Sequence, residues 1–141
     1  MNLKGINNGG VMAILPLMPG GNSVTAQKNM REARSHGTSR NMALPSTYYW
    51  FYQMVRNHGQ WDYKQQSYSL ANFGNFNYGA AGFAAGIPAE TLLMGAGFAQ
   101  SRAGTSKPNW GAWYGKPPYG DDPHDQFWIK QGIDYAREHG Y

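Results

Sequence analysis

Apolar residues recur at helical spacing in several stretches of the chain, and segments rich in glycine and proline separate these stretches. The first predicted helix covers residues 24–36. It follows Ser23, a residue type common at helix N-caps, and stops at Gly37, which suits a helix end. The second predicted helix covers residues 47–58 and stops at Gly59.

The second helix carries a stripe of apolar residues at positions i, i+3, i+4 and i+7, formed by Tyr48, Phe51, Tyr52 and Val55. Residues with this spacing share one face of a helix. We therefore expect that face to pack into the core.

Residues 76–102 mix glycine and alanine with aromatic rings and predict two helices broken at Gly86, because Pro88 suits a first helical turn and Gly104 suits a helix end. Gly82 and Gly86 are four positions apart, with an alanine beside each. Small residues at that spacing let another element approach the helix backbone closely.

The last predicted helix has Asp122 as its N-cap, Pro123 and Asp125 in its first turn, and runs toward Gly140. Before it, residues 105–119 hold too many glycines and prolines for a helix and predict an ordered loop. The predicted fold class is mainly α, with α+β as the alternative: a compact single domain of about four helices and one long ordered Gly/Pro/aromatic loop.

The length of 141 residues fits one domain. We expect residues 1–22 to form a leader or a junction with a larger protein and residues 23–141 to form the functional domain. Pro16 interrupts the early apolar stretch and no small-residue cleavage site follows it closely, so a secretory signal is not predicted. No stretch is long enough to predict a transmembrane segment.

Charged residues make up 14% of the chain and aromatic residues 15%, so polar uncharged and aromatic side chains should dominate a surface suited to polar polymers such as sugars. The formal net charge of +4 is uneven: the first 60 residues hold six Lys and Arg and one acid, Glu32, which gives +5, and the remaining residues hold six Lys and Arg and seven acids, which gives −1. That basic half is either ordinary solvated charge or a surface for an anionic partner such as nucleic acid. The lack of cysteine excludes disulfides, thiolate metal sites and cysteine nucleophiles.

Candidate chemistry begins with the segment YGDDPHDQ, which places Asp121, Asp122 and Asp125 beside His124. Carboxylate and imidazole groups together suit a divalent metal such as Mg, Mn or Zn. Negative charge is also favourable at a helix N-terminus, so capping alone explains the same residues.

Two further carboxyl groups are candidates for acid–base chemistry. Asp62 and Lys64 in the segment WDYK form either a turn with an ion pair or a general base beside a cation. Glu90 is the single acid between Tyr63 and Gly120. Apolar surroundings would raise its pKa and suit a general acid, whereas a place in a first helical turn would favour it through the helix dipole alone.

Aromatic and amide side chains are the candidates for substrate contacts. Trp110 and Trp113 in the predicted loop either form a stacking platform or cover the core. Asn75 and Asn77 either orient a substrate or cap a helix, and with Phe73 they are predicted to line a cleft. No phosphate-binding glycine loop, nucleophile elbow or paired-histidine zinc motif is present in the sequence.

Three segments, WFYQMVRNHGQWDYKQ, FGNFNYGAAGFAAGIPAETLLMGAG and PPYGDDPHDQFWIKQGIDY, together resemble the bacterial polymorphic toxin type 44 domain. That family occurs at the C-terminal ends of large secreted or contact-delivered proteins such as Rhs-type effectors. The resemblance implies an antibacterial toxin that a larger carrier delivers into a neighbouring bacterium, with a cognate immunity protein in the producer. The matching motif residues are Trp61, Asp62, Tyr63, Lys64, Phe73, Gly74, Asn75, Asn77, Gly79, Glu90, Asp121, Asp122, Asp125 and Gln126.

The resemblance leaves the reaction open, and three hypotheses remain. The first is a peptidoglycan-directed hydrolase acting in the periplasm, with Glu90 as general acid and Asp62 or one of the three clustered aspartates as base or nucleophile. The second is a nuclease in the target cytoplasm, which uses His124 with Lys64 or a metal held by the aspartates. The third is a toxin that binds a membrane or a partner without chemistry.

We favour the envelope hydrolase because the charged fraction is low and the aromatic fraction is high. Glycoside hydrolysis requires two carboxyl groups about 5 Å apart for retention or about 6.5–9.5 Å apart for inversion. The predicted substrate contacts are Trp61, Tyr63, Phe73, Asn75, Asn77, Trp110, Trp113 and Gln126.

Overall fold

The structure, a computed structural model, describes residues 12–38 and 42–141. Within these residues the chain is helical and contains no strand. The α-helices are α1 (Val24–Ser35), α2 (Pro45–Val55), α3 (Tyr63–Gln66), α4 (Ala71–Ala84), α5 (Ala89–Arg102) and α6 (Pro123–Glu138), and the 3-10 turns are η1 (Pro19–Gly21), η2 (Tyr68–Leu70) and η3 (Pro108–Trp110). The predicted mainly α fold is confirmed, and the described residues do not support the α+β alternative.

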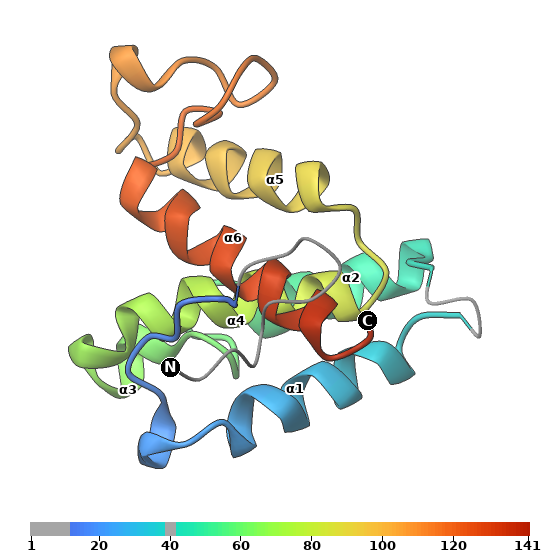
Figure 1. The fold of residues 1–141 in the computed structure, drawn as a ribbon. Coiled ribbons are helices and arrows are strands. Elements are labelled where there is room, and N and C mark those ends of the chain that lie inside the picture. Colours follow the sequence, from blue (N-terminus) through green and yellow to red (C-terminus); the bar gives the residue numbers. More distant parts are fainter. Residues whose placement is uncertain (1–11, 39–41) are drawn as a thin grey trace.

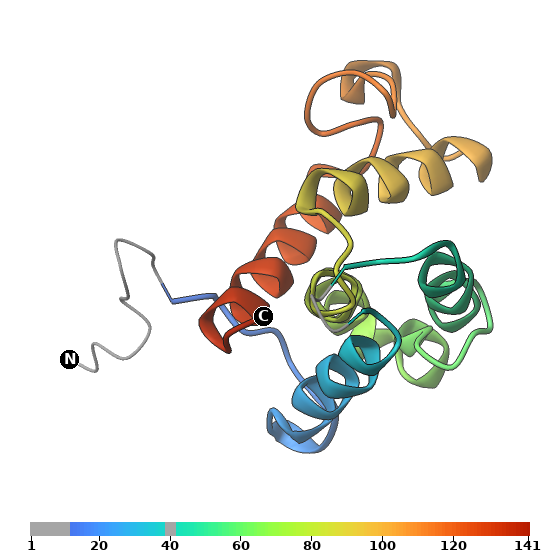
Figure 2. The same cartoon turned by 90° about the vertical axis from the view of Figure 1, so that its right-hand side faces the viewer.

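Helix α4 lies at the centre of the molecule, with the other helices arranged around it (Figures 1 and 2). Phe73, Phe76, Asn77 and Ala80 on this helix are fully buried. A helix that is apolar on all sides belongs in a core, and this position explains why the segment combines the smallest residues with the largest.

Helices α4 and α6 cross at two glycines. A Cβ atom on Gly79 would collide with the backbone oxygen of Ile129, and one on Gly132 would collide with the backbone oxygen of Phe76. Side chains at these positions would push the helices apart, so the crossing requires glycine on both helices. No local sequence signal predicted that these two glycines would meet.

The close approach expected at Gly82 is confirmed, because a Cβ atom there would lie 3.0 Å from Cζ of Phe51 and would also collide with Leu92. Gly86 instead forms the break between α4 and α5 and has a φ of 93°, a left-handed conformation that glycine adopts without steric cost. The break was predicted at this residue.

The core face predicted for the second helix is right at Phe51 and Val55 and wrong at Tyr48 and Tyr52. Phe51 is buried and Val55 packs against the core, whereas Tyr48 and Tyr52 are 41% and 59% exposed. Thr47 and Met54 are buried and share helical spacing with Phe51, so the buried face is rotated away from the two tyrosines. This arrangement avoids burying two phenol hydroxyl groups.

The ends of the other helices agree with the predictions to within a few residues, with two corrections. Helix α4 begins at Ala71 rather than at residue 76. Ser23 precedes α1 without a side-chain cap hydrogen bond, and Asn22 Oδ1 accepts from the backbone N–H of Val24 at 3.0 Å instead. At the last helix the predicted cap is confirmed, since Asp122 Oδ1 accepts from the N–H of His124 at 2.9 Å.

The segment before α1 packs onto α6. Ala13 and Met18 are buried, the N–H of Ala13 donates to Glu138 Oε1 at 2.5 Å, and the N–H of Ile14 donates to Gln131 Oε1 at 2.8 Å. Part of the expected leader or junction, residues 12–22, is thus in contact with the folded body. Residues 1–11 lie outside the described residues, and the boundary at residue 23 stays a prediction.

The predicted ordered loop before α6 folds over the end of α5 (Figure 1). The N–H of Gly120 donates to the backbone oxygen of Trp110 at 2.8 Å, and Ser106 Oγ donates to the backbone oxygen of Gly120 at 2.6 Å. Gly97 lets the backbone of Tyr119 lie directly against α5. These contacts fix the start of α6, where the acidic residues lie.

Candidate active site

Helices α3, α4 and α6 bring together five polar side chains that we call the Asp125 cluster: Lys64, Asn75, Asp122, His124 and Asp125. Asn75 Nδ2 donates to Asp125 Oδ1 at 3.2 Å, and His124 Nδ1 lies 3.9 Å from the same oxygen. Each helix contributes at least one group, so the tertiary fold assembles this site.

Asp125 has a pKa above the ordinary aspartate value. Partial burial is the main cause, and the charge of Asp122 adds to it, while His124, Lys64 and the hydrogen bond from Asn75 act in the opposite direction. The side chain keeps 36% of its surface exposed. Asp125 can therefore hold a proton longer than a free aspartate and still reach a bound molecule, as a general acid must.

His124 has a defined orientation beside Asp125. Trp128 Nε1 donates to His124 Nε2 at 3.4 Å, so the neutral ring carries its own proton on Nδ1, the atom nearer Asp125. The imidazole is 63% exposed. The ring therefore lies at the rim of the cluster, within reach of solvent.

Asp121 lies beneath the cluster rather than in it. The side chain is 2% exposed, and Oδ2 accepts from Gln126 Nε2 at 2.7 Å. Burial raises the pKa of Asp121 to about 6. A buried carboxyl group held in this way supports the first turn of α6 and has no surface for substrate.

The other predicted acid–base residues lie apart from the cluster. Glu90 is exposed in the first turn of α5, so the apolar surroundings expected for it are absent. Asp62 is buried, and Oδ2 accepts from the N–H of His58 at 2.8 Å. The ion pairs formed within the described ranges do not include Asp62 with Lys64, whose charge acts on Asp125 instead.

Glu90 and Asp62 do not form a carboxyl pair. Tyr63, next to Asp62, packs on Phe73 near the start of α4, whereas Glu90 follows the end of that helix. Helix α4 has 14 residues and is therefore about 20 Å long. The expected pairing of these two carboxyl groups in one cleft is corrected.

Four of the predicted substrate contacts are core residues. Trp61 packs edge-on against Trp50 with ring centroids 5.4 Å apart, and Phe73 is fully buried. The Tyr63 hydroxyl and Asn77 Oδ1 both accept from Nδ2 of the buried Asn29, at 2.7 and 2.9 Å. The structure therefore corrects the expected cleft wall: Asn75 reaches the site, and the buried residues hold α1, α3 and α4 together.

The two loop tryptophans differ in exposure. Trp110 is half-buried beneath Lys107 Nζ, which lies 5.1 Å from its ring centroid. Trp113 is exposed and meets Phe98 and Tyr114 edge-on, each with centroids 5.3 Å away. Trp113 therefore remains a candidate for stacking on a ligand, together with its two exposed neighbours.

A metal site does not fit these residues. Asp121 is engaged by Gln126 and Asp122 caps α6, so the four groups considered above do not converge. No three His, Asp or Glu side chains elsewhere in residues 12–38 and 42–141 are grouped to hold a metal ion.

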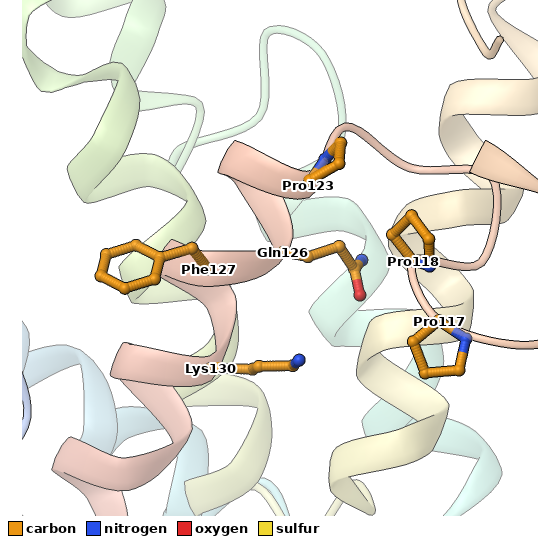
Figure 3. A pocket seen from close by; sticks show the side chains of 6 residues that line it. All are labelled: Pro117, Pro118, Pro123, Gln126, Phe127 and Lys130. Carbon is orange, nitrogen blue, oxygen red and sulfur yellow. The ribbon is translucent and has the colours of Figure 1, made fainter. Parts of the chain in front are cut away.

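A groove of about 320 Å³ lies on the other side of Gln126, which we call the proline groove (Figure 3). Its lining residues come from the loop before α6 and from one face of that helix: Pro117, Pro118, Pro123, Gln126, Phe127 and Lys130. Gln126, a predicted substrate contact, thus lies between Asp121 and an open groove.

The sequence of residues 53–138 matches the model of the bacterial toxin 44 family. The chain belongs to this family. The matched residues include the whole Asp125 cluster and every residue of the proline groove. No curated protein and no solved structure matches the chain.

Sequence reasoning did not find three parts of this toxin domain's site region. Phe127 and Lys130 line the groove, and the only available signal was their helical spacing from Pro123 and Gln126. Asn29, which links α1 to the core, had no sequence signal.

Within the described ranges no helix is both long and apolar enough to cross a membrane.

Proposed function

We propose that this toxin domain hydrolyses the glycan strands of peptidoglycan. The observation that carries the proposal is the half-buried carboxyl group of Asp125, which lies where three helices meet and has a raised pKa. A proton donor for a glycosidic oxygen needs this combination of retained proton and access.

In the proposed reaction Asp125 donates its proton to the glycosidic oxygen as the bond to the anomeric carbon breaks. Water attacks that carbon and gives its proton to a second carboxylate. Asp122 is the candidate, because it is partly exposed whereas Asp121 is buried. Asn75 orients Asp125, and Lys64 and His124 balance the negative charge that remains after proton transfer.

The charge of the cluster favours a glycan over a nucleic acid. The cluster holds two aspartates, one lysine and one histidine, and the buried Asp121 lies beneath it, so the local charge does not favour an anion. Phosphate groups would be repelled there. The exposed rings of Trp113, Tyr114 and Phe98 add apolar faces on which sugar rings can stack.

We further propose that a larger carrier delivers the domain into a neighbouring bacterium, where it acts in the periplasm, and that the producer holds a cognate immunity protein. Membership of a bacterial toxin family supports delivery and an immunity partner. The choice of periplasm follows from the proposed substrate.

The test is to express the domain in a bacterium with and without an export signal and to compare killing. The Asp125→Asn variant should lose at least about 100-fold of the activity on purified sacculi, measured as new reducing ends, because it removes the proton donor. Asp134→Asn is the matched control, since Asp134 lies on the same helix in an exposed pair with Arg137. Glu90→Gln should remain active.

Killing only after export, lost in Asp125→Asn and kept in Asp134→Asn, would support the proposal. Killing without export, with degraded nucleic acid, would replace it with the nuclease hypothesis. Undiminished killing by folded Asp125→Asn and Asp62→Asn variants would point to a toxin that acts by binding.

A further inference from the structure

The proline groove occupies a face of α6 that the core does not use. Its four helix residues, Pro123, Gln126, Phe127 and Lys130, have the spacing i, i+3, i+4 and i+7. The residues that α6 packs against α4 form a separate stripe: Ile129, Gly132, Ile133 and Ala136. The groove is therefore a second organised face of the helix.

The floor of the groove contains an unused hydrogen-bond acceptor. Gln126 Nε2 donates to Asp121 Oδ2 at 2.7 Å and to the backbone oxygen of Leu93 at 3.2 Å. Because both partners are acceptors, the amide cannot be turned over without placing an oxygen against them. Its orientation is thereby fixed.

Gln126 Oε1 is buried and has no hydrogen-bond partner among the described residues. The whole side chain is 3% exposed. A buried acceptor without a partner destabilises the folded protein, and a ligand N–H that approaches it from the groove would remove that cost. Figure 3 shows the amide between Pro118 and Lys130, with the oxygen on the Lys130 side.

The rest of the groove defines the ligand. Lys130 extends from α6 toward Pro117 and places a positive charge at the side to which Oε1 points (Figure 3). Pro117 and Pro118 present apolar rings near the Gln126 amide, whereas the Phe127 ring points to the other side of α6 (Figure 3). The groove therefore fits a ligand that carries an N–H donor, a small acyl group and an anionic group close together.

We propose that the proline groove binds a secondary amide with a small acyl group and a nearby carboxylate. The amide N–H donates to Gln126 Oε1, the acyl methyl packs on Pro117 and Pro118, and Lys130 Nζ donates to the carboxylate. An N-acetylated sugar acid and an N-acylated amino acid both have this chemistry. The inference concerns binding alone and does not rest on the proposed reaction.

The experiment is an NMR titration of the whole chain with two probes, N-acetylmuramic acid and N-acetylalanine. We expect saturable shifts at Phe127, at Lys130 and at the side-chain amide of Gln126. Lys130→Gln should weaken binding of the tighter probe about tenfold, because it removes a charged hydrogen bond from an exposed position that the fold does not need. The matched control Lys28→Gln changes an exposed lysine on α1 and should leave affinity unchanged.

Two further probes test each half of the ligand. N-acetylglucosamine, which lacks the carboxylate, should bind wild type and Lys130→Gln equally. Muramic acid, which lacks the N-acetyl group, should not shift the NMR signal of the Gln126 side-chain amide. The tighter of the two main probes identifies the source as glycan or peptide. Absence of saturable shifts with both, or equal affinity in Lys130→Gln, would overturn the proposal. Activity of the Asp125 variants is measured separately, so either proposal can fail alone.

Discussion

The two halves of α6 are held against the rest of the molecule in different ways. The C-terminal half crosses α4 at Gly132, where the two backbones touch and no side chain intervenes. The N-terminal half holds Asp125 and follows Asp121 and the N-cap Asp122, and both Asp121 and Asp125 have raised pKa values. One half is fixed by shape and the other by hydrogen bonds and charge.

This difference shows how a small domain can keep carboxyl groups partly buried, where their charged form is unfavourable. Backbone contact at the crossing leaves α6 no room to slide or roll on α4. The first turn of the helix can then keep carboxyl groups in partly buried positions that a looser helix would release to water. Four measurements test that division.

The largest effect is expected from Gly79→Ala, which should lower the free energy of unfolding by about 3 kcal/mol because the new methyl group meets the backbone of α6. Urea unfolding followed by circular dichroism measures it. Gly74→Ala is the control on the same helix, where a Cβ atom would lie 3.9 Å from Tyr63 Cβ. That variant should be unchanged or more stable by up to about 1 kcal/mol. Equal behaviour of both variants would contradict the proposed crossing.

The next effect concerns pH. The pKa of Asp121 is raised to about 6 in the folded protein, so its contribution favours the folded state at low pH and is lost as the pH rises through about 6. Asp121→Asn removes this dependence. Relative to wild type, the variant should gain about 2 kcal/mol of stability between pH 4 and pH 7.5. Urea unfolding at both pH values measures the difference in free energy of unfolding between the variant and wild type. An equal difference at the two pH values would show that the pKa of Asp121 is not raised.

Asn75→Ala should keep the fold and lower activity about tenfold, since Asp125 remains but loses its orienting hydrogen bond. Because this bond favours the ionised carboxylate, its removal should raise the pKa of Asp125 further. The alkaline limb of the pH–rate profile should then move to higher pH. A lower rate with an unmoved profile would assign Asn75 to substrate contact instead.

The smallest effect separates capping from chemistry at Asp122. Asp122→Ala should cost about 1 kcal/mol of stability, whereas Asp122→Ser keeps a cap and should cost less. Both variants remove the carboxylate, so both should lose activity on sacculi. An active serine variant would restrict Asp122 to capping α6.

Much of the helical layout followed from local sequence signals. The cap at Asp122, the break at Gly86 and the ordered loop before α6 each depend on residues within a few positions of one another. The start of α4 was missed because glycine and asparagine in its first turns have low helix propensity, which burial in the centre of the molecule overrides.

The site was harder to predict than the fold because its groups lie on three helices. The motif residues Lys64, Asn75 and Asp125 were identified, yet nothing local indicated that Lys64 acts on Asp125 rather than on Asp62. Burial was equally hidden. Trp61 and Phe73 are aromatic residues of the kind that stack on sugars, but both are buried in the core.

The segment before α1 has a consequence for how the domain can be cut. Its backbone is joined to Gln131 and Glu138 of α6, so an early part of the described chain depends on its last helix. Trimming the final turn would remove the Glu138 carboxylate that accepts from Ala13, and removing the segment would leave Gln131 without the N–H of Ile14. The segment before α1 and helix α6 therefore hold each other in place. We expect a cut in either one to loosen the helix that carries Asp125.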